Sequence, residues 1–445
     1  MFQAVLAEAK RRFLRADSAD IRHVETCIAK VQSVGMPAHT SPLSRYVQET
    51  ITLPGAGNEG KTIDFERAGP RQQLYFCPGE TKAAIVTCGG LCPGINDVVR
   101  SVFLEMHFRY GCGDILGIRF GYAGLDPANG FEPLHIDAEM VEDIQLNGGS
   151  ILGTSRGPVD PGIAIDYLQK HRVNVLFCVG GDGTLRGAHE LHLEAVSRGY
   201  ALAVVGIPKT IDNDISYVWR SFGYQTAIDE AVRVIGAAHS EARSHFNGIG
   251  LVKLMGRDAG FLAAGATVAS QEVNYTLIPE VPFQLHGEKG FLVELKQRMQ
   301  SLHHAVIVVA EGAGQDLMSV GPPSLDLSGN PHHADIGCFL RDEIQSYFQA
   351  EGIPLTLKYF DPSYLIRSRP ANCDDGLLCN QFGRHAVHAA MAGKTDVVIG
   401  LWYNVFVHVP IPNAIATKRR MAPDGELWSG VLAATGQPAA FQADV

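Results

Sequence analysis

Two carboxylates stand two residues apart in the segment 208–214, which reads Pro-Lys-Thr-Ile-Asp-Asn-Asp. In an extended segment, residues two apart point the same way, so Asp212 and Asp214 would face one ligand together. Two such acids beside a phosphate suit a general base and a partner that orients the reaction or holds a metal ion. Surface acids in a turn are the alternative interpretation.

A third carboxylate, Asp182, lies between glycines in the segment 180–184, Gly-Gly-Asp-Gly-Thr. Glycines after a strand and before a helix let backbone amides approach an anion. Asp182 could then hold Mg²⁺ through one oxygen while the amides bind phosphate, as Mg²⁺ usually binds with a nucleotide. The alternative is a capped helix start, because Asp and Thr are good N-cap residues. The pair Gly89 and Gly90 gives a weaker signal of the same kind.

Other polar side chains could bind a sugar phosphate. Arg257 follows the apolar run Ile-Gly-Leu-Val-Lys-Leu and so should lie at a strand end, where a fixed guanidinium can neutralise a transferring phosphoryl group. Glu311 also follows an apolar run, and could accept hydrogen bonds from sugar hydroxyls or cap a helix. Tyr364 and Arg367 could hold another phosphate. A surface ion pair and core packing are the alternatives for each residue taken alone.

Four short apolar runs must position most of these residues; they begin at Lys82, Asn174, Ala201 and His304. Each run is bounded by glycine or proline, which predicts a buried strand of about five residues. Near-continuous apolar strands that alternate with helices indicate a parallel sheet covered on both faces. Loops at the carboxyl ends of such strands form the ligand crevice, and the glycine-rich and acidic clusters follow the runs at those ends.

Composition excludes several classes of protein. The chain has 445 residues, of which 46% are hydrophobic and 19% charged, and carries a net charge of −10. This much apolar surface excludes a mostly disordered chain. An acidic chain without a basic block is a poor match for nucleic acid, and no apolar run reaches the ~18 residues needed to span a membrane. The 48 glycines, about 11% against a usual ~7%, should mark tight turns or backbone next to a ligand.

The first 80 residues are harder to interpret. Residues 1–20 have charges every few positions, which predicts an amphipathic helix and no signal peptide. The segment 55–62 matches the phosphate-binding pattern G-x-x-x-x-G-K-[ST], but Pro54 before it and Gly69-Pro70 after it leave no strand and long helix. We therefore interpret it as a chance match. The nine scattered cysteines favour free thiols in a reducing cytoplasm.

Taken together, the motifs resemble the phosphofructokinase family. The motifs GGLCPGIN, GGDGT, PKTIDND, MGR and EG occur in that family's order, and the chain resembles the long ATP-dependent enzymes of plant type and their bacterial relatives. The resemblance implies two Rossmann-like αβα domains with mainly parallel sheets and an active-site cleft between them. It also implies, from the start of the chain, an N-terminal extension 1–80, a nucleotide-binding domain 81–224 and 376–430, a fructose 6-phosphate-binding domain 225–375, and a C-terminal tail 431–445.

The resemblance also implies a role for each matching residue. Those expected at the nucleotide phosphates are Gly90, Arg156, Gly157, Gly181, Asp182, Gly183, Thr184 and Lys209, with Asp182 serving Mg²⁺. Asp212 would take the proton of the sugar 1-hydroxyl, while Thr210, Asp214 and Arg257 would support the transferring phosphoryl group. Those expected to hold fructose 6-phosphate are Thr210, Ile211, Asp212, Met255, Gly256, Arg257, Glu311, Tyr364 and Arg367. The implied reaction transfers the γ-phosphoryl group of ATP to fructose 6-phosphate.

The phosphoryl donor needs a separate argument. Diphosphate-using relatives have aspartate where this chain has Gly183, and a carboxylate there would crowd and repel the α-phosphate of ATP. Those relatives share Lys209, however, so the two diagnostic positions are mixed. Plant-type ATP enzymes show the same combination, which favours ATP; a diphosphate-dependent enzyme is the alternative, and a non-catalytic regulatory subunit is a more distant one.

Assembly is a further expectation from the resemblance. We expect a cytoplasmic homodimer or homotetramer with no nucleic-acid or membrane partner. Short bacterial enzymes have an arginine, at the position of Gly248, that reaches a neighbouring subunit's substrate. Any contact of that kind must come from elsewhere in this chain.

Overall fold

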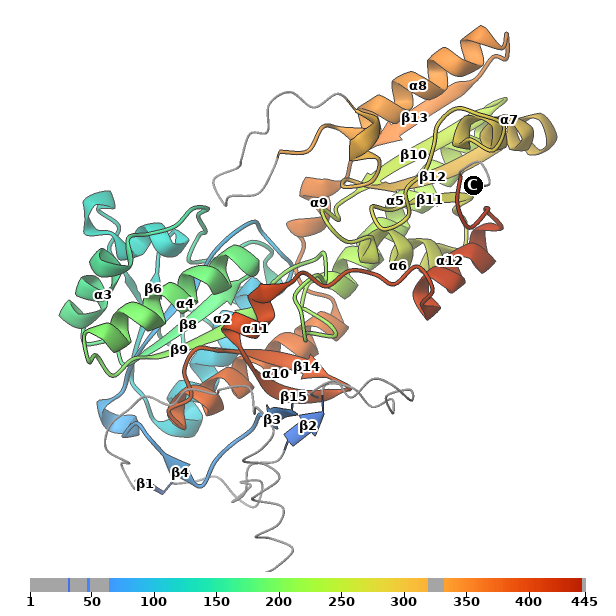
Figure 1. Cartoon of the computed structure of the whole chain (residues 1–445). Helices are drawn as coiled ribbons and strands as arrows, with labels where there is room; N and C mark the ends of the chain where they lie inside the picture. The colour runs from blue at the N-terminus through green and yellow to red at the C-terminus, as the bar shows by residue number, and fades with distance from the viewer. Residues whose placement is uncertain (1–30, 33–45, 49–63, 319–331, 442–445) are drawn as a thin grey trace, which may run out of the picture. The chain divides into compact units, whose positions relative to one another are not determined.

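The computed structural model describes residues 31–32, 46–48, 64–318 and 332–441. The expected N-terminal amphipathic helix and the segment 55–62 lie outside the described residues. The chain divides into two compact units (Figure 1). Unit 1 comprises Met1–Lys209, Ile215–Phe222 and Gly376–Lys418, and unit 2 comprises Thr210–Asp214, Gly223–Asp375 and Arg419–Val445.

These units differ in part from the domains expected from the sequence. Residues 210–214, 223–224 and 419–430 group with unit 2, whereas the sequence assigned them to the nucleotide-binding domain. Residues 431–441 also pack within unit 2, where the Phe441 side chain is buried against the rings of Tyr275 and Phe291. Which ligand each domain binds stays a prediction, because compactness alone says nothing about ligands.

Unit 1 is built on a nine-stranded sheet. Its strands, in spatial order, are β2 (Tyr46–Gln48), β3 (Asp64–Arg67), β15 (Val405–Pro410), β14 (Val397–Trp402), β9 (Ala203–Pro208), β8 (Val175–Gly180), β5 (Lys82–Thr87), β6 (Asp114–Ile118) and β7 (Leu134–His135). Strands β14 to β6 run parallel, and the outer strands are antiparallel. A separate pair joins β1 (Val31–Gln32) to β4 (Gln73–Leu74).

Helices cover both faces of this sheet. They are α2 (Ile95–Leu104), α3 (Pro161–Lys170), α4 (Asp182–Ser197), α10 (Cys373–Met391) and α11 (Ile411–Ala416), with shorter helical segments η1 (Pro78–Glu80), η2 (Glu105–Tyr110), η3 (Gly121–Leu125), η4 (Pro127–Asn129) and η5 (Ile144–Leu146). The crossover from β5 through α2 to β6 runs one way along the sheet and the crossover from β8 through α4 to β9 runs the other way. Right-handed crossovers therefore place α2 and α4 on opposite faces, as Figure 1 shows.

Unit 2 contains a four-stranded parallel sheet in the order β11 (Tyr275–Leu277), β12 (His304–Ala310), β10 (Gly248–Leu254) and β13 (Thr356–Phe360). Its helices are α5 (Tyr224–Ser244), α6 (Phe261–Ser270), α7 (Phe291–Leu302), α8 (Ile336–Ala350), α9 (Ser363–Arg367) and α12 (Glu426–Thr435), with the short segment η6 (Gln315–Leu317). One core packs α7 and α8 against Ile249 and Leu251 of β10.

The opposite face of β10 is covered by α5. A Cβ atom at Gly248 would overlap the carbonyl oxygen of Ala242 in α5, and a Cβ atom at Gly250 would lie 2.7 Å from the carbonyl oxygen of Ala238. The helix therefore packs directly on the strand backbone at these two glycines. An arginine at position 248, as in short bacterial enzymes, would require α5 to move away.

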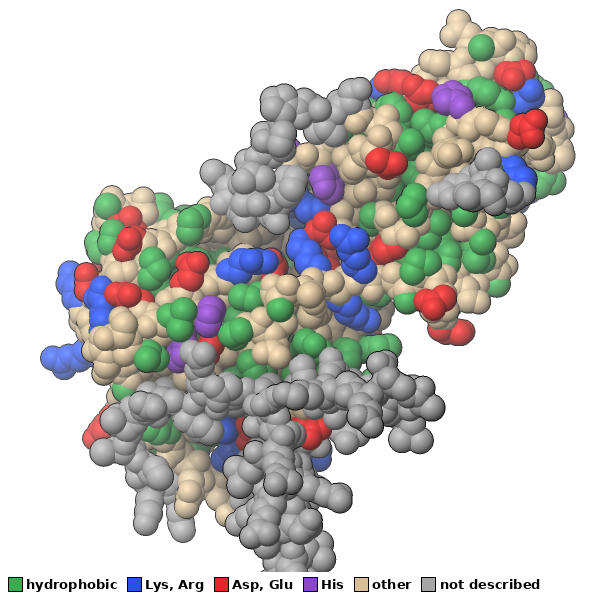
Figure 2. Space-filling model, in the orientation of Figure 1, with side chains coloured by type: hydrophobic (Ala, Val, Ile, Leu, Met, Phe, Trp, Pro, Cys, Tyr) green, Lys and Arg blue, Asp and Glu red, His purple; other side chains and the backbone are tan. Residues whose placement is uncertain are grey.

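The four predicted strands are confirmed as β5, β8, β9 and β12. All four run parallel to a neighbouring strand and are almost fully buried. On the molecular face drawn in Figure 2, acidic and basic side chains are interspersed. Within the described part of the chain, no helix is both long and apolar enough to cross a membrane.

Candidate active site

The carboxyl ends of β5 and β8 mark a topological switch point in the sheet of unit 1. Strand β5 lies between β6 and β8, so the chain leaves β5 on one side and returns on the other. Such a reversal opens a crevice at the carboxyl ends of the strands, where α/β proteins bind ligands. Gly89 and Gly90 follow β5, and Gly181 follows β8. Most of the glycine-rich motifs predicted to bind phosphate thus lie at this switch point.

The loop with Arg156 and Gly157 is held at the same place. The Gly89 amide donates to the Ser155 carbonyl oxygen over 2.9 Å, and the Thr154 hydroxyl donates to the Gly89 carbonyl oxygen over 2.6 Å. These two hydrogen bonds fix the loop against the end of β5. Arg156 is exposed there, so the structure brings its side chain and the Gly89–Gly90 turn into one neighbourhood.

Lys209 connects three strand ends. Its amide donates to the Gly180 carbonyl oxygen over 3.0 Å, and its buried ammonium donates to the Gly90 carbonyl oxygen over 2.7 Å. The end of β9 is thereby tied to β8 and β5. The arrangement adds a positive charge next to backbone that the sequence predicts to bind phosphate.

The first turn of α4 carries the Gly-Asp-Gly-Thr part of the motif. Gly181 is the N-cap residue and no side chain caps the helix, so the alternative of a start capped by Asp182 or Thr184 is wrong. Thr184 is buried, and its carbonyl oxygen accepts a hydrogen bond of 2.6 Å from the Tyr122 hydroxyl. A 16-residue helix whose first amides have no side-chain cap presents donors and a positive dipole end to an anion.

The Asp182 carboxylate fits a magnesium ligand. Its Oδ2 atom forms an ion pair with the Arg186 guanidinium at 3.0 Å, one turn further along α4. Its Oδ1 atom has no hydrogen-bond or ion-pair partner among the described residues. No group of three or more acidic, histidine or cysteine side chains in the described residues could hold a metal ion alone. One carboxylate oxygen completed by nucleotide phosphates is the way Mg²⁺ usually binds at such a site.

In unit 2, the segment with Asp212 and Asp214 is a turn, and the expected extended conformation is wrong. Asn213 is buried and has a left-handed backbone with φ 54°. The Thr210 hydroxyl accepts a hydrogen bond of 3.1 Å from the Asp212 amide and donates one of 3.2 Å to Asp214 Oδ1. A threonine side chain that bonds the backbone two residues on favours a turn. The turn still groups Thr210, Asp212 and Asp214, now through the threonine hydroxyl.

Arg419 holds this turn and is absent from the sequence prediction. Its amide donates to the Asp214 carbonyl oxygen over 2.8 Å, and its Nη1 atom donates to the Asn213 carbonyl oxygen over a long 3.5 Å. The guanidinium also lies 4.5 Å from the centre of the Phe261 ring, and burial lowers its pKa to about 10. The Lys-Arg-Arg run at 418–420 is the only sequence signal, and it does not indicate which residue turns inward.

The same C-terminal segment is tied to the start of α6. The Met421 amide donates to Glu280 Oε1 over 2.9 Å, and both Glu280 carboxylate oxygens accept from the Gly260 amide at 2.9 and 3.0 Å. Gly260 is the N-cap residue of α6 and closely follows the Met-Gly-Arg motif. Residues 419–421 therefore connect the aspartate turn to the Met-Gly-Arg loop within unit 2.

The loops after β10 and β12 approach each other closely. The Glu311 amide donates to the Leu254 carbonyl oxygen over 2.9 Å, and the Gly312 amide donates to the Gly256 carbonyl oxygen over 3.1 Å. A Cβ atom at Gly312 would overlap the carbonyl oxygen of Arg257. The structure thus brings Glu311 beside Met255, Gly256 and Arg257, as the predicted sugar site requires. Burial raises the pKa of Glu311, and the positive charges of Arg257 and Lys253 oppose that rise.

Tyr364 and Arg367 lie on α9, which follows β13 at the same carboxyl edge. The Arg367 guanidinium lies 4.5 Å from the centre of the Tyr364 ring, a distance typical of a cation–π contact. Tyr364 is 75% exposed. The two side chains therefore form one unit that is open to a ligand.

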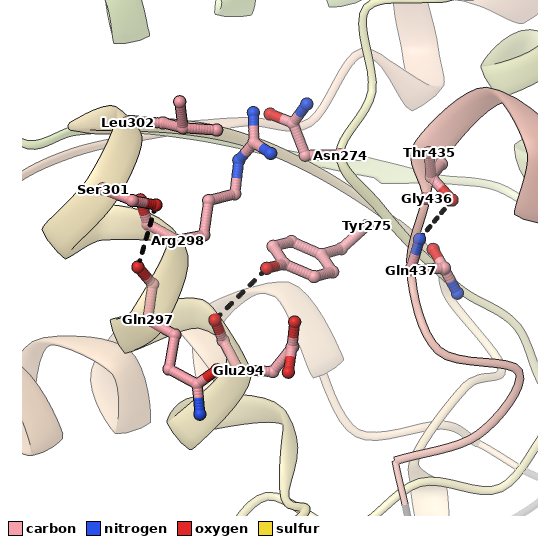
Figure 3. A pocket seen from close by; sticks show the side chains of 10 residues that line it. All are labelled: Asn274, Tyr275, Glu294, Gln297, Arg298, Ser301, Leu302, Thr435, Gly436 and Gln437. Atoms are coloured by element: carbon pink, nitrogen blue, oxygen red, sulfur yellow. Dashed lines mark hydrogen bonds between the residues drawn. The ribbon is translucent and has the colours of Figure 1, made fainter.

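A separate cavity of about 270 Å³ lies at the other edge of the unit 2 sheet (Figure 3). It is lined by Asn274, Tyr275, Glu294, Gln297, Arg298, Ser301, Leu302, Thr435, Gly436 and Gln437. Asn274 and Tyr275 stand at the start of β11, so this cavity lies at the amino ends of the strands. It contains none of the predicted site residues.

Comparison with known proteins identifies the family of this chain. Residues 82–390 match the family model described as Phosphofructokinase. An ATP-dependent 6-phosphofructokinase of Borreliella burgdorferi is 47% identical over 86% of this chain and 87% of its own length. One of Entamoeba histolytica is 46% identical, over 86% and 88%. A chloroplastic one of Arabidopsis thaliana is 44% identical, over 84% and 69%.

Solved structures show the fold of these relatives. A pyrophosphate-dependent phosphofructokinase from Nitrosospira multiformis matches with a TM-score of 0.66 at 19% identity, covering 80% of this chain and 91% of its own. Phosphofructokinase from Pichia pastoris in the T-state matches with a TM-score of 0.62 at 23% identity, covering 80% and 37%. The expected fold class is confirmed by these similarities.

Proposed function

This chain belongs to the phosphofructokinase family, and we propose that it is an ATP-dependent 6-phosphofructokinase. It would transfer the γ-phosphoryl group of ATP to the 1-hydroxyl of fructose 6-phosphate, giving fructose 1,6-bisphosphate and ADP. Relatives with the ATP-dependent name cover more than four-fifths of the chain. The observation that supports this proposal best is the open first turn of α4, where Gly183 leaves backbone amides accessible to phosphate.

We propose that the carboxyl edge of the unit 1 sheet binds ATP. The Gly89–Gly90 turn, the loop with Arg156 and Gly157, and the first turn of α4 supply backbone amides and one guanidinium to the phosphates. Asp182 would hold Mg²⁺ through Oδ1, and the ion, when bound, would neutralise charge on the phosphates. The Arg186 contact orients the carboxylate for that role.

The acceptor would bind to unit 2. Arg257, Glu311, Tyr364 and Arg367, with backbone of Met255 and Gly256, are proposed to hold fructose 6-phosphate. Asp212 would accept the proton of the 1-hydroxyl as the oxygen attacks the γ-phosphorus atom, with Thr210, Ile211 and Asp214 positioning the reacting groups. Such a reaction needs mainly positioning and charge neutralisation from the protein, and these side chains can supply both.

Lys209 is the residue that favours the alternative donor, diphosphate. In unit 1 its ammonium donates to the Gly90 carbonyl oxygen, and its amide to the Gly180 carbonyl oxygen. This structural role accounts for a lysine at the position without requiring a diphosphate donor. Gly183, which favours ATP, therefore carries more weight than Lys209 in the choice of donor. The presence of Asp212 argues against a non-catalytic subunit.

The oligomeric state and the cellular location of the protein are two further parts of the proposal. We infer a homodimer or homotetramer, because the family resemblance implies an oligomer. A cytoplasmic location is supported by the free thiol of every cysteine that the structure describes, although one relative carries the name chloroplastic.

Replacement of the proposed base tests the mechanism. Asp212→Asn should lower kcat by about 10²–10⁴-fold, because the 1-hydroxyl loses its proton acceptor, while the KM for ATP changes little. Asp424→Asn is a matched control, since Asp424 is exposed. Steady-state kinetics with varied ATP and varied fructose 6-phosphate make the measurement. An Asp212→Asn enzyme with the kcat of the control would rule out this base.

A further inference from the structure

Lys253 is a charged residue in an otherwise apolar strand. Strand β10 is buried at every position except Lys253, whose side chain is 12% exposed. A lysine is rarely found at so low an exposure unless its charge is paired. The Lys253 ammonium lies 3.0 Å from Asp335 Oδ2 and 2.9 Å from Asp361 Oδ2. One ammonium thus binds two carboxylates at the carboxyl end of β10.

Each of these two aspartates also lies at the start of a helix. Asp335 caps α8 by accepting hydrogen bonds from the amides of Gly337 and Cys338 at 3.0 and 3.1 Å. Asp361 Oδ1 accepts from the Ser363 amide at 3.2 Å and from the Ser363 hydroxyl at 2.5 Å, at the first residue of α9. Through two carboxylates, Lys253 therefore joins the starts of α8 and α9 to the central strand of the sheet.

Opposite charges strengthen the contacts of Lys253 with Asp335 and Asp361. Burial by itself would lower the pKa of Lys253, but the hydrogen bonds to Asp361 and Asp335 outweigh burial and raise it. Burial would raise the pKa of Asp361, and the contacts with Lys253 and Ser363 lower it instead. All three groups are therefore ionised at neutral pH, and charge-assisted hydrogen bonds are the stronger ones in proteins.

Helix α9 needs such an anchor. It has five residues, too few to be stable as an isolated helix. Tyr364 and Leu365 are 75% and 69% exposed, and Ile366 is buried. Its position thus depends on its packing against α5, with Ile366 buried, and on the Asp361 contact at its start.

We propose that Lys253 is a positioning residue for the sugar-phosphate site, because it fixes α9 and with it Tyr364 and Arg367. The proposal rests on the proposed function, in which these two side chains hold fructose 6-phosphate. Lys253 would act on the substrate through Asp361 and α9, and its positive charge also acts on Glu311. The lone lysine in the run Ile-Gly-Leu-Val-Lys-Leu is the sequence signal of this role.

Lys253→Met tests the proposal, with Lys296→Met as its matched control. Lys296 belongs to the same unit and forms an ion pair of 2.7 Å with Glu351, at the surface. Lys253→Met should raise the KM for fructose 6-phosphate by about 10- to 100-fold, since small misplacements of binding groups have effects of this size. The kcat and the KM for ATP should stay within about threefold, and the control should resemble wild type.

Asp361→Asn and Asp335→Asn separate the contributions of the two ion pairs that Lys253 forms. Asp361→Asn should reproduce the KM increase, because it weakens the contact with α9, whereas Asp335→Asn should change it less. Direct binding of fructose 6-phosphate, measured by titration calorimetry, should weaken in parallel in Lys253→Met. If Lys253→Met does not fold, Asp361→Asn carries the test alone.

Three results would overturn the positioning role. The first is a Lys253→Met or Asp361→Asn enzyme with the KM of Lys296→Met. The second is a fall in kcat together with equal rises in the KM values for ATP and for fructose 6-phosphate, which would indicate general disruption. The third is unchanged calorimetric binding. Failure of the proposed function is distinguishable, because the wild-type protein would then neither bind nor phosphorylate fructose 6-phosphate.

Discussion

Glycine occupies two positions in α4, 183 and 187, for different physical reasons. A Cβ atom at Gly187 would lie 2.6 Å from ring atom Cε2 of Tyr122, so a larger residue would collide in the core. A Cβ atom at Gly183 would meet no atom within 4 Å. No described residue therefore requires glycine at 183, and the reason lies in the ligand that we propose to bind there.

Gly183→Asp should reduce ATP use without reducing stability. A carboxylate in the first turn of a helix is favourable for the helix dipole, so the melting temperature should not fall. Repulsion of the ATP phosphates by a like charge costs several kcal/mol, which predicts a loss of about 100-fold or more in kcat/KM for ATP.

Gly187→Ala is the contrasting variant, with about 1–3 kcal/mol of destabilisation from overpacking. Kinetics and thermal unfolding of both variants make the comparison. A Gly183→Asp protein that melts as early as Gly187→Ala, or that uses ATP as well as wild type, contradicts the assignment.

At the scale of elements, parallel strands of unit 2 bring together the residues proposed to bind fructose 6-phosphate. The loops after β10 and β12 touch through the Gly312 amide and the Gly256 carbonyl oxygen. The pairing of β10 with β12 and this hydrogen bond hold the loops with Arg257 and Glu311 beside each other. The site therefore depends on how closely the two loops can approach.

Gly312→Ala should push these loops apart, because the added methyl group would overlap the Arg257 carbonyl oxygen. We expect about 1–3 kcal/mol of destabilisation and a higher KM for fructose 6-phosphate, with the KM for ATP unchanged. Gly236→Ala in α5 is the control, since a Cβ atom there meets nothing within 4 Å, and a helical alanine is stabilising. Urea unfolding and kinetics together check this; an unchanged fructose 6-phosphate KM would refute it.

Strands were predictable from sequence, whereas contacts between distant segments were not. The runs at Lys82, Asn174, Ala201 and His304 are confirmed as strands, because buried parallel strands are continuously apolar. The Asp212–Asp214 segment was wrongly expected to be extended, because Thr210 bonds the backbone locally. Within each unit, predicting strand ends was sufficient to group most of the predicted site residues, since the parallel strands of one sheet end at one edge.

Contacts across the sequence escaped prediction for a different reason. Arg419 reaches the Asp214 turn from more than two hundred residues away. Lys253 meets Asp335 and Asp361 only because β10 lies beside β13. No local sequence pattern indicates which distant partner a charged side chain contacts. The roles of Arg419 and Lys253 are therefore visible only in the folded structure.

At the scale of the whole molecule, buried charge affects stability. Glu66 on β3 is 2% exposed and lies 3.0 Å from the Lys394 ammonium and 3.1 Å from His408 Nδ1. Burial would raise the pKa of Glu66, but these contacts outweigh burial and lower it. The outer strand β3 is thereby anchored to the sheet of unit 1 by an ionised carboxylate. The nearby His385 ring stacks on Phe406 at 4.5 Å.

Acid should weaken the folded state through His385. Burial lowers its pKa to about 3 from an ordinary value of 6.5. The folded protein keeps this ring neutral, while the unfolded chain takes up a proton below pH 6.5, so stability is complete above that pH and falls as the pH decreases. Between about pH 7.5 and pH 5 this group should cost about 1–2 kcal/mol.

His385→Phe should remove that part of the pH dependence, and His135→Phe, at an exposed position, should not. Urea unfolding at both pH values gives the comparison. Equal pH slopes for His385→Phe and wild type would show that this histidine is not the titrating group.

The central claim, an ATP-dependent phosphofructokinase, is tested most directly by the choice of donor. Purified wild-type protein is given fructose 6-phosphate and Mg²⁺ with either ATP or diphosphate, and fructose 1,6-bisphosphate is measured. We predict turnover with ATP, at a kcat/KM about 100-fold or more above that with diphosphate. Turnover with diphosphate and none with ATP would contradict the account.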